Sequence, residues 1–159
     1  MKSPVLFIML FLTTACGYHL RGSVNLPDAL NNIFISNASS SLNKAFKDIY
    51  KEKLVKSAAT AELVIKILKE ELTRHTISTD TSGYSNEFAL VYRIDFNILD
   101  GQGKILSANQ RIRLNKSYVN NQSGDTLLAK NNEETLLRKE LYNQAVYSMT
   151  SKARAVLSK

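Results

Sequence analysis

The sequence contains few residues that could cross-link the fold or carry out catalysis. It has one cysteine, two prolines and no tryptophan in 159 residues. A single cysteine excludes an internal disulfide, so the fold must rely on its core, and 44% hydrophobic residues allow one. No G-x-S-x-G, H-E-x-x-H or phosphate-loop pattern occurs, and neither His19 nor His75 has a Cys or His partner at metal-ligand spacing. We therefore expect no enzyme active site, no metal and no cofactor.

The single cysteine, Cys16, follows a short apolar segment. Lys2 supplies a positive charge, Val5 to Leu12 is an unbroken apolar run, and small residues follow up to Cys16. This is the plan of a secretory signal peptide, and it is too short to span a bilayer. A cysteine directly after the small residues resembles the lipobox of bacterial lipoproteins, although Thr13 stands where Leu is usual. The alternative is a signal cut elsewhere, with Cys16 as an ordinary thiol.

The lipobox predicts the domain organisation and the location of the mature chain. Residues 1–15 would be a cleaved signal peptide, and residues 16–159 a single domain with a diacylglycerol on the Cys16 sulfur. Two or more acyl chains anchor a protein stably. Because Gly17, not Asp, follows the cysteine, we expect a lipid anchor in the outer membrane.

The mature chain is basic, with 20 Lys and Arg against 14 Asp and Glu. A basic excess favours anionic partners. An exported, membrane-tethered domain seldom meets nucleic acid, so anionic lipid headgroups or phosphorylated glycolipids are the better candidates. The surplus could equally serve solubility alone.

The apolar periodicity predicts an α+β fold. The expected elements are a strand at 33–35, an amphipathic helix at 42–54, a strand at 63–68 parallel to the first, a loop at 73–86, a strand at 88–98, a turn at 100–103, a strand at 106–115, a loop at 116–130 and a final helix from near Asn131, capped with Glu134. This pattern indicates a four-stranded mixed sheet with two helices packed on one face. The 42–54 helix could instead present its apolar side to a membrane or a partner.

The other face of this sheet would be polar. Alternation places Arg93 on the same face as Asp95, and Arg111 and Arg113 on the matching face of the next strand. Arginines offer paired donors to phosphate or carboxylate, although such a face is often merely solvated. The two polar loops are further contact candidates. The acidic pairs Glu70-Glu71 and Glu133-Glu134 are interpreted as solvated charges, not as catalytic acid and base.

Three segments resemble the LptE family of lipopolysaccharide-assembly lipoproteins: CGYHLRG at residues 16–22, EFALVYRIDFNIL at 87–99 and LLAKNNEETLLRKELYNQA at 127–145. The resemblance implies a non-enzymatic lipoprotein that plugs the outer-membrane β-barrel LptD, helps it to fold and binds lipopolysaccharide. It also implies that Lys130, within LAKNNE, contacts lipopolysaccharide. The competing hypothesis is a solitary periplasm-facing lipoprotein that binds an anionic ligand.

Overall fold

The computed structural model describes residues 31–79, 81–119 and 127–158, with the backbone alone for 127–132. Cys16 and the expected signal peptide lie outside these residues. The elements along the chain are β1 (Ile33–Ser36), α2 (Ser40–Tyr50), two 3-10 turns (Lys51–Lys53 and Ala58–Thr60), β2 (Leu63–Thr79), β3 (Ser85–Asp100), β4 (Ile105–Val119) and α3 (Leu127–Leu157).

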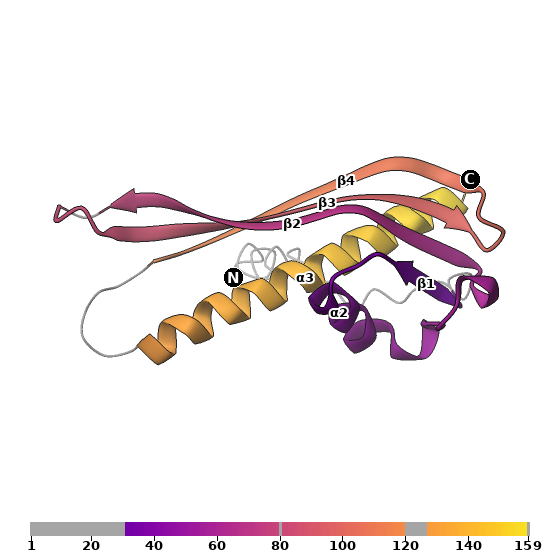
Figure 1. Cartoon of the computed structure of the whole chain (residues 1–159), viewed down its shortest axis with the longest axis horizontal. Coiled ribbons are helices and arrows are strands. Elements are labelled where there is room, and N and C mark those ends of the chain that lie inside the picture. The colour runs from indigo at the N-terminus through magenta and orange to yellow at the C-terminus, as the bar shows by residue number, and fades with distance from the viewer. Residues whose placement is uncertain (1–30, 80, 120–126, 159) are drawn as a thin grey trace, which may run out of the picture.

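The strands form one mixed sheet in the order β1-β2-β3-β4. β1 and β2 are parallel, whereas the other neighbours are antiparallel. Both helices lie on one face of this sheet (Figure 1), which we call the inner face. The predicted α+β architecture is therefore confirmed. The strand order, which the sequence left open, simply follows the chain.

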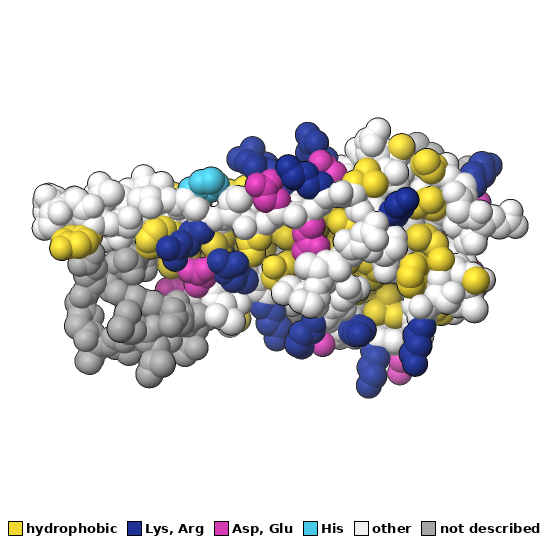
Figure 2. Space-filling model, in the orientation of Figure 1, with side chains coloured by type: hydrophobic (Ala, Val, Ile, Leu, Met, Phe, Trp, Pro, Cys, Tyr) yellow, Lys and Arg dark blue, Asp and Glu magenta, His cyan; other side chains and the backbone are white. Residues whose placement is uncertain are grey.

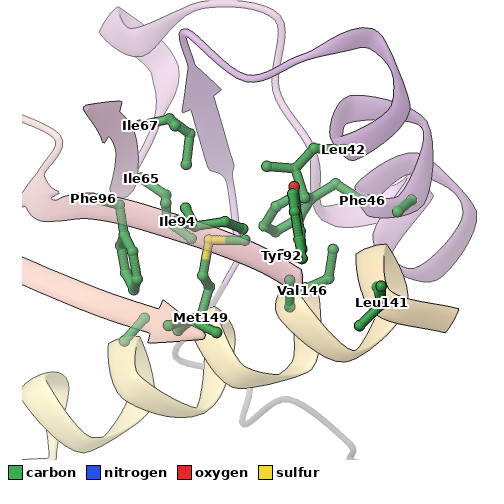
Figure 3. Close-up of a cluster of buried hydrophobic side chains, with 14 of the residues drawn as sticks. Leu42, Phe46, Ile65, Ile67, Tyr92, Ile94, Phe96, Leu141, Val146 and Met149 are labelled. Carbon is green, nitrogen blue, oxygen red and sulfur yellow. The ribbon is translucent and has the colours of Figure 1, made fainter. Parts of the chain in front are cut away.

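The core lies between the inner face and the two helices. β3 contributes Tyr92, Ile94 and Phe96, all essentially inaccessible to solvent, and Figure 3 shows them beside residues from α2 and α3. The apolar stripes predicted for both helices are confirmed by their buried members: Leu42, Ala45, Phe46, Leu141, Ala145, Val146, Met149 and Ala153. One buried polar contact joins the helices, because the Tyr50 hydroxyl lies 3.2 Å from Thr150 Oγ1.

The boundaries predicted around the two polar loops are wrong. The segment 73–86 is mostly strand, since β2 continues to Thr79 and β3 begins at Ser85. Its threonines are β-branched and pair across the strands, for example Thr73 with Val91, so a polar stretch still makes a good strand. In 116–130, β4 runs to Val119 and α3 begins at Leu127, while 120–126 lie outside the described residues. Asn131 therefore lies within α3 and does not cap it.

A bulge in β2 exchanges the faces of that strand. Ile67 pairs with Phe96, but the next pair is Lys69 with Asp95, so Leu68 is an extra residue and is 48% exposed. Before the bulge the odd-numbered side chains face the helices, and after it, as far as Thr76, the even-numbered ones do. A similar shift in β4 leaves Ala108 exposed, whereas strict alternation from Leu106 predicts that Ala108 lies on the inner face.

The bulge places Glu70 on the inner face, where it holds the start of α2. Its carboxylate accepts hydrogen bonds from the Ser39 N–H at 2.9 Å and the Ser39 hydroxyl at 2.6 Å. It also accepts from the Tyr92 hydroxyl at 2.7 Å. Ser39 in turn caps α2, because its Oγ accepts from the Leu42 N–H at 3.2 Å. Burial is the main cause that raises the pKa of Tyr92, and its hydrogen bond to Glu70 raises the pKa further. The Tyr92 hydroxyl therefore stays protonated and donates to Glu70. The interpretation of Glu70 as a solvated charge is therefore wrong.

We expect Glu70→Ala to destabilise the fold by about 2 kcal/mol, because Ser39 and the buried Tyr92 hydroxyl lose their acceptor. The matched control is Glu71→Ala, one residue along on the opposite face, where Glu71 forms an exposed ion pair with Lys69 at 3.4 Å. That variant should cost less than about 0.5 kcal/mol. Urea unfolding followed by circular dichroism measures both. Equal losses would mean that Glu70 does not hold the start of α2.

Candidate functional site: a charged patch on the outer face of the sheet

The face of the sheet that points away from the helices carries a compact set of charged residues. Strand register arranges them in two rows across β2, β3 and β4. One row is Lys69, Asp95 and Arg111, and the other is Glu71, Arg93 and Arg113. Together these six residues, here called the charged patch, line a shallow hollow of about 280 Å³. Figure 2 shows basic and acidic side chains gathered along the upper side of the molecule, over the sheet.

Only half of the cations in the charged patch are neutralised within it. Arg111 binds the Asp95 carboxylate through two hydrogen bonds, Nε to Oδ1 at 2.6 Å and Nη2 to Oδ2 at 2.9 Å. Lys69 pairs with Glu71. Within the described ranges, neither Arg93 nor Arg113 has an ion pair or a side-chain hydrogen bond. The patch therefore presents two guanidinium groups that no described residue neutralises.

The Arg111 guanidinium also keeps its partner ionised. Its hydrogen bonds lower the pKa of Asp95, with a further contribution from the positive charge of Lys69. Asp95 therefore stays an anion that fixes Arg111 in place. A phosphate or carboxylate arriving at the patch would meet the planar forks of Arg93 and Arg113, which suit bidentate recognition of such groups.

The structure brings together some of the candidate residues and not others. Arg93, Arg111 and Arg113 share one face, as alternation predicted. Lys130 lies in the first turn of α3, within the helix layer, so the fold does not bring it to the charged patch. Its side chain lies outside the described part of the chain. Lys69 and Glu71 were missed, because their place on the outer face depends on the bulge at Leu68.

A second polar cluster, also missed, ties α3 to the far end of the sheet. The Glu134 carboxylate accepts hydrogen bonds from the Tyr118 hydroxyl, from Arg138 at 2.8 and 2.6 Å, and from Arg74 at 3.3 Å. Arg74 also lies over the Phe88 ring, 4.4 Å from its centroid. The interpretation of Glu134 as a solvated charge is therefore wrong, and nothing in the local sequence distinguishes it from exposed Glu133.

This cluster predicts a pH dependence. Burial alone would raise the pKa of Glu134, but hydrogen bonds from Tyr118 and Arg138 outweigh it and hold the pKa below its ordinary 4.5. A carboxylate with a lowered folded pKa stabilises the fold above its unfolded pKa and loses that contribution as pH falls through the folded value. We expect Glu134→Gln to be about 1 kcal/mol less stable than the wild type at neutral pH.

The difference in stability between the wild type and Glu134→Gln should shrink below about pH 4.5. Urea midpoints measured from about pH 7 to about pH 3 test this. Glu133→Gln changes the same charge at the exposed neighbouring position and should follow the wild type throughout. A difference that is constant with pH would contradict the role given to the Glu134 carboxylate.

The described residues hold neither a grouping of His, Cys, Asp and Glu suited to a metal ion nor a helix long and apolar enough to cross a membrane. What the site can do, on its own geometry, is bind anions. The charged patch offers arginines on a rigid three-stranded surface, with no nucleophile held beside a base. This chemistry is that of a binding surface.

The sequence of this chain is similar to those of known lipoproteins. A family model described as "LptE: Lipopolysaccharide-assembly" matches residues 24–153. The LPS-assembly lipoprotein LptE of Pectobacterium atrosepticum is 23% identical over 154 residues, which cover 93% of this chain and 82% of that protein.

Solved structures of lipoproteins share the architecture. The uncharacterized lipoprotein B of Nitrosomonas europaea superposes with a TM-score of 0.69 at 28% identity, over 89% of this chain and 93% of its own. The rare lipoprotein B of Shewanella oneidensis gives a TM-score of 0.57 at 22% identity, over 76% and 93%, and shows the fold alone. Since the family model spans most of the chain, the protein belongs to the LptE family of lipopolysaccharide-assembly lipoproteins.

Proposed function

We propose that this chain is a non-enzymatic outer-membrane lipoprotein that plugs the LptD β-barrel, helps it to assemble and binds lipopolysaccharide during delivery to the outer leaflet. Membership of the LptE family supports the lipopolysaccharide-assembly role. The lipobox-like segment ending at Cys16 supports the lipid anchor.

The observation that carries the binding step is the pair of uncommitted arginines in the charged patch. Arg93 and Arg113 are neighbours across β3 and β4, so their guanidinium groups project from the same face of a rigid sheet. Lipopolysaccharide carries phosphate groups, which arginine forks bind as charge-assisted pairs. Lys130, taken from the family resemblance, is an independent candidate, because it lies on a different layer of the fold.

The outer surface also suits a seat inside a barrel. The lumen of a large outer-membrane barrel is polar and lined by water. The outer face of the sheet carries the charged patch and continues through Thr73, His75, Asn115 and Ser117, which occupy matching register positions on β2 and β4. Val91 and Ala89 lie between these pairs on β3, and the polar and charged side chains on the flanking strands could contact a polar lumen.

Purification of the tagged full-length chain from its native envelope in mild detergent, followed by mass spectrometry, tests the partnership. A large β-barrel protein recovered in near-equal amount would support the plug. Recovery of the lipoprotein alone would contradict it and favour the second candidate, a solitary periplasm-facing lipoprotein that binds an anionic ligand. That candidate also fits the charged patch, since anion binding there does not require a barrel.

The anchor has its own test. Cells grown with labelled palmitate should incorporate label into the wild-type chain, and Cys16→Ser should abolish this, because the thiol is the attachment atom. Immunoblotting controls for the amount of each protein. The Cys16→Ser chain should also retain the uncleaved signal peptide and run larger on a gel. Label that persists in this variant would exclude Cys16 as the lipidated residue.

A further inference from the structure

The second concentration of positive charge lies on the helix side of the molecule. Residues 44–56, from α2 through the following 3-10 turn, hold five lysines against two acidic residues, a net +3 of the chain's +7. Lys44 pairs with Asp48 at 3.0 Å. The other four have no ion pair or side-chain hydrogen bond with any described residue, and we call them the lysine surface: Lys47, Lys51, Lys53 and Lys56. Figure 2 shows basic side chains along the lower edge of the molecule, opposite the charged patch.

The lysine surface lies where the N-terminal segment joins the fold. The Val55 N–H donates to the Ile33 carbonyl at 3.0 Å, and Ile33 forms a parallel bridge with Leu54. Lys53 and Lys56 immediately flank Leu54 and Val55 in the sequence. The chain that leads from Cys16 therefore enters the domain directly beside the lysines. The segment 17–32 can span at most roughly 60 Å when fully extended, so a lipid on Cys16 keeps this surface within reach of the bilayer.

The chemistry of the surface suits an interface of headgroups better than a single bound ligand. Lysine ammonium groups are compact, strongly hydrated charges on flexible stems, without the planar fork that selects one phosphate. Lys47, Lys51 and Lys56 are exposed, and Lys53 is half-buried. Each lysine close to an anionic membrane surface contributes about 1 kcal/mol of attraction, and the tether removes most of the cost of the encounter.

We infer that the lysine surface docks on the anionic phospholipid headgroups of the leaflet that holds the acyl chains of Cys16. The inference rests on the proposed lipidation for its location in the cell, but not on the proposed roles with lipopolysaccharide or a barrel.

Vesicle binding by the chain without its anchor tests the surface alone. The buried core residues of the described part of the chain lie between Ile33 and Ala153, so a chain from Gly17 to Lys159 keeps them, and circular dichroism verifies its fold. It should co-sediment with vesicles of equal parts phosphatidylglycerol and phosphatidylcholine at low salt. It should be released at high salt, and it should not bind phosphatidylcholine alone.

Matched charge reversals locate the contact. Lys51→Glu/Lys56→Glu should weaken binding to the anionic vesicles by at least about tenfold. Lys66→Glu/Lys104→Glu changes the net charge equally, at exposed lysines on β2 and in the β3–β4 turn, and should weaken binding by less than about threefold. Equal losses would reduce the effect to net charge and overturn the inference. So would failure of the wild-type chain to bind, or equal binding to vesicles without phosphatidylglycerol. Each outcome leaves the pull-down with the barrel unaffected.

Discussion

Replacing Arg93 and Arg113 together with glutamine is expected to weaken the binding of lipopolysaccharide at least about tenfold. These two residues carry the charge of the patch that is not already used internally, whereas Arg111 is held by Asp95. Their loss therefore removes the donors that a phosphate would meet. Displacement of a fluorescent lipopolysaccharide from the purified full-length lipoprotein measures the change.

Two variants separate this effect from net charge. Lys47→Gln/Lys51→Gln removes the same charge from the helix layer and should leave the affinity for lipopolysaccharide within about threefold of the wild type. Lys130→Gln tests the candidate derived from the family resemblance. If Lys130 alone accounts for the loss and the arginine pair does not, the charged patch is a solvated surface and the binding site lies near the start of α3.

The largest loss of stability should come from Gly101→Ala, about 3 kcal/mol. Gly101 lies in the β3–β4 turn, which packs against the chain just before β2. A Cβ atom there would lie 2.0 Å from the Ala61 carbonyl oxygen, a backbone atom that cannot swing aside. The turn must therefore move away from the residues before β2, or Ala61 must shift together with the start of β2. Urea unfolding at neutral pH measures the cost.

Gly103, two residues along in the same turn, is the matched control. It has a positive φ of 84°, but nothing lies within 4 Å of an added Cβ. Gly103→Ala should therefore cost only the left-handed backbone strain, about 1 kcal/mol. If Gly103→Ala is as damaging as Gly101→Ala, the limiting feature of this turn is its backbone conformation and not the contact with Ala61.

The elements that follow a simple period were predictable from the sequence. The alternation from Phe88 to Ile98 gave a strand with one buried face, and the helical spacing of Leu141, Val146 and Met149 gave the stripe that covers it. These patterns depend on local geometry alone. The Thr- and Ser-rich segment 73–79 was predicted as a loop, because its polar residues hide a strand that is set by pairing with β3.

The charged patch was predictable only in part, for a reason that a single residue explains. Simple alternation correctly places Arg93 on β3, and it places Arg111 and Arg113 on the part of β4 that follows the register shift. On β2 the inner-facing residues Leu63, Ile65 and Ile67 would, without a bulge, be followed by Lys69 and Glu71 on the same face. The extra residue at Leu68 reverses this and sends both to the patch. Period alone does not reveal where a strand slips by one residue.

The order of the strands has a consequence for how the domain reaches its folded state. β2, β3 and β4 pair in chain order through short connections, so this antiparallel part of the sheet can form by successive closure of short loops, which is fast, whereas β1 joins β2 only across the segment that contains α2. The contact between Tyr50 and Thr150, in contrast, joins residues 100 positions apart and needs α3, the last element to be synthesised. Until α3 docks, part of the apolar inner face of the sheet stays open to solvent. The aggregation-prone stage of folding is therefore the period before α3 docks on the sheet.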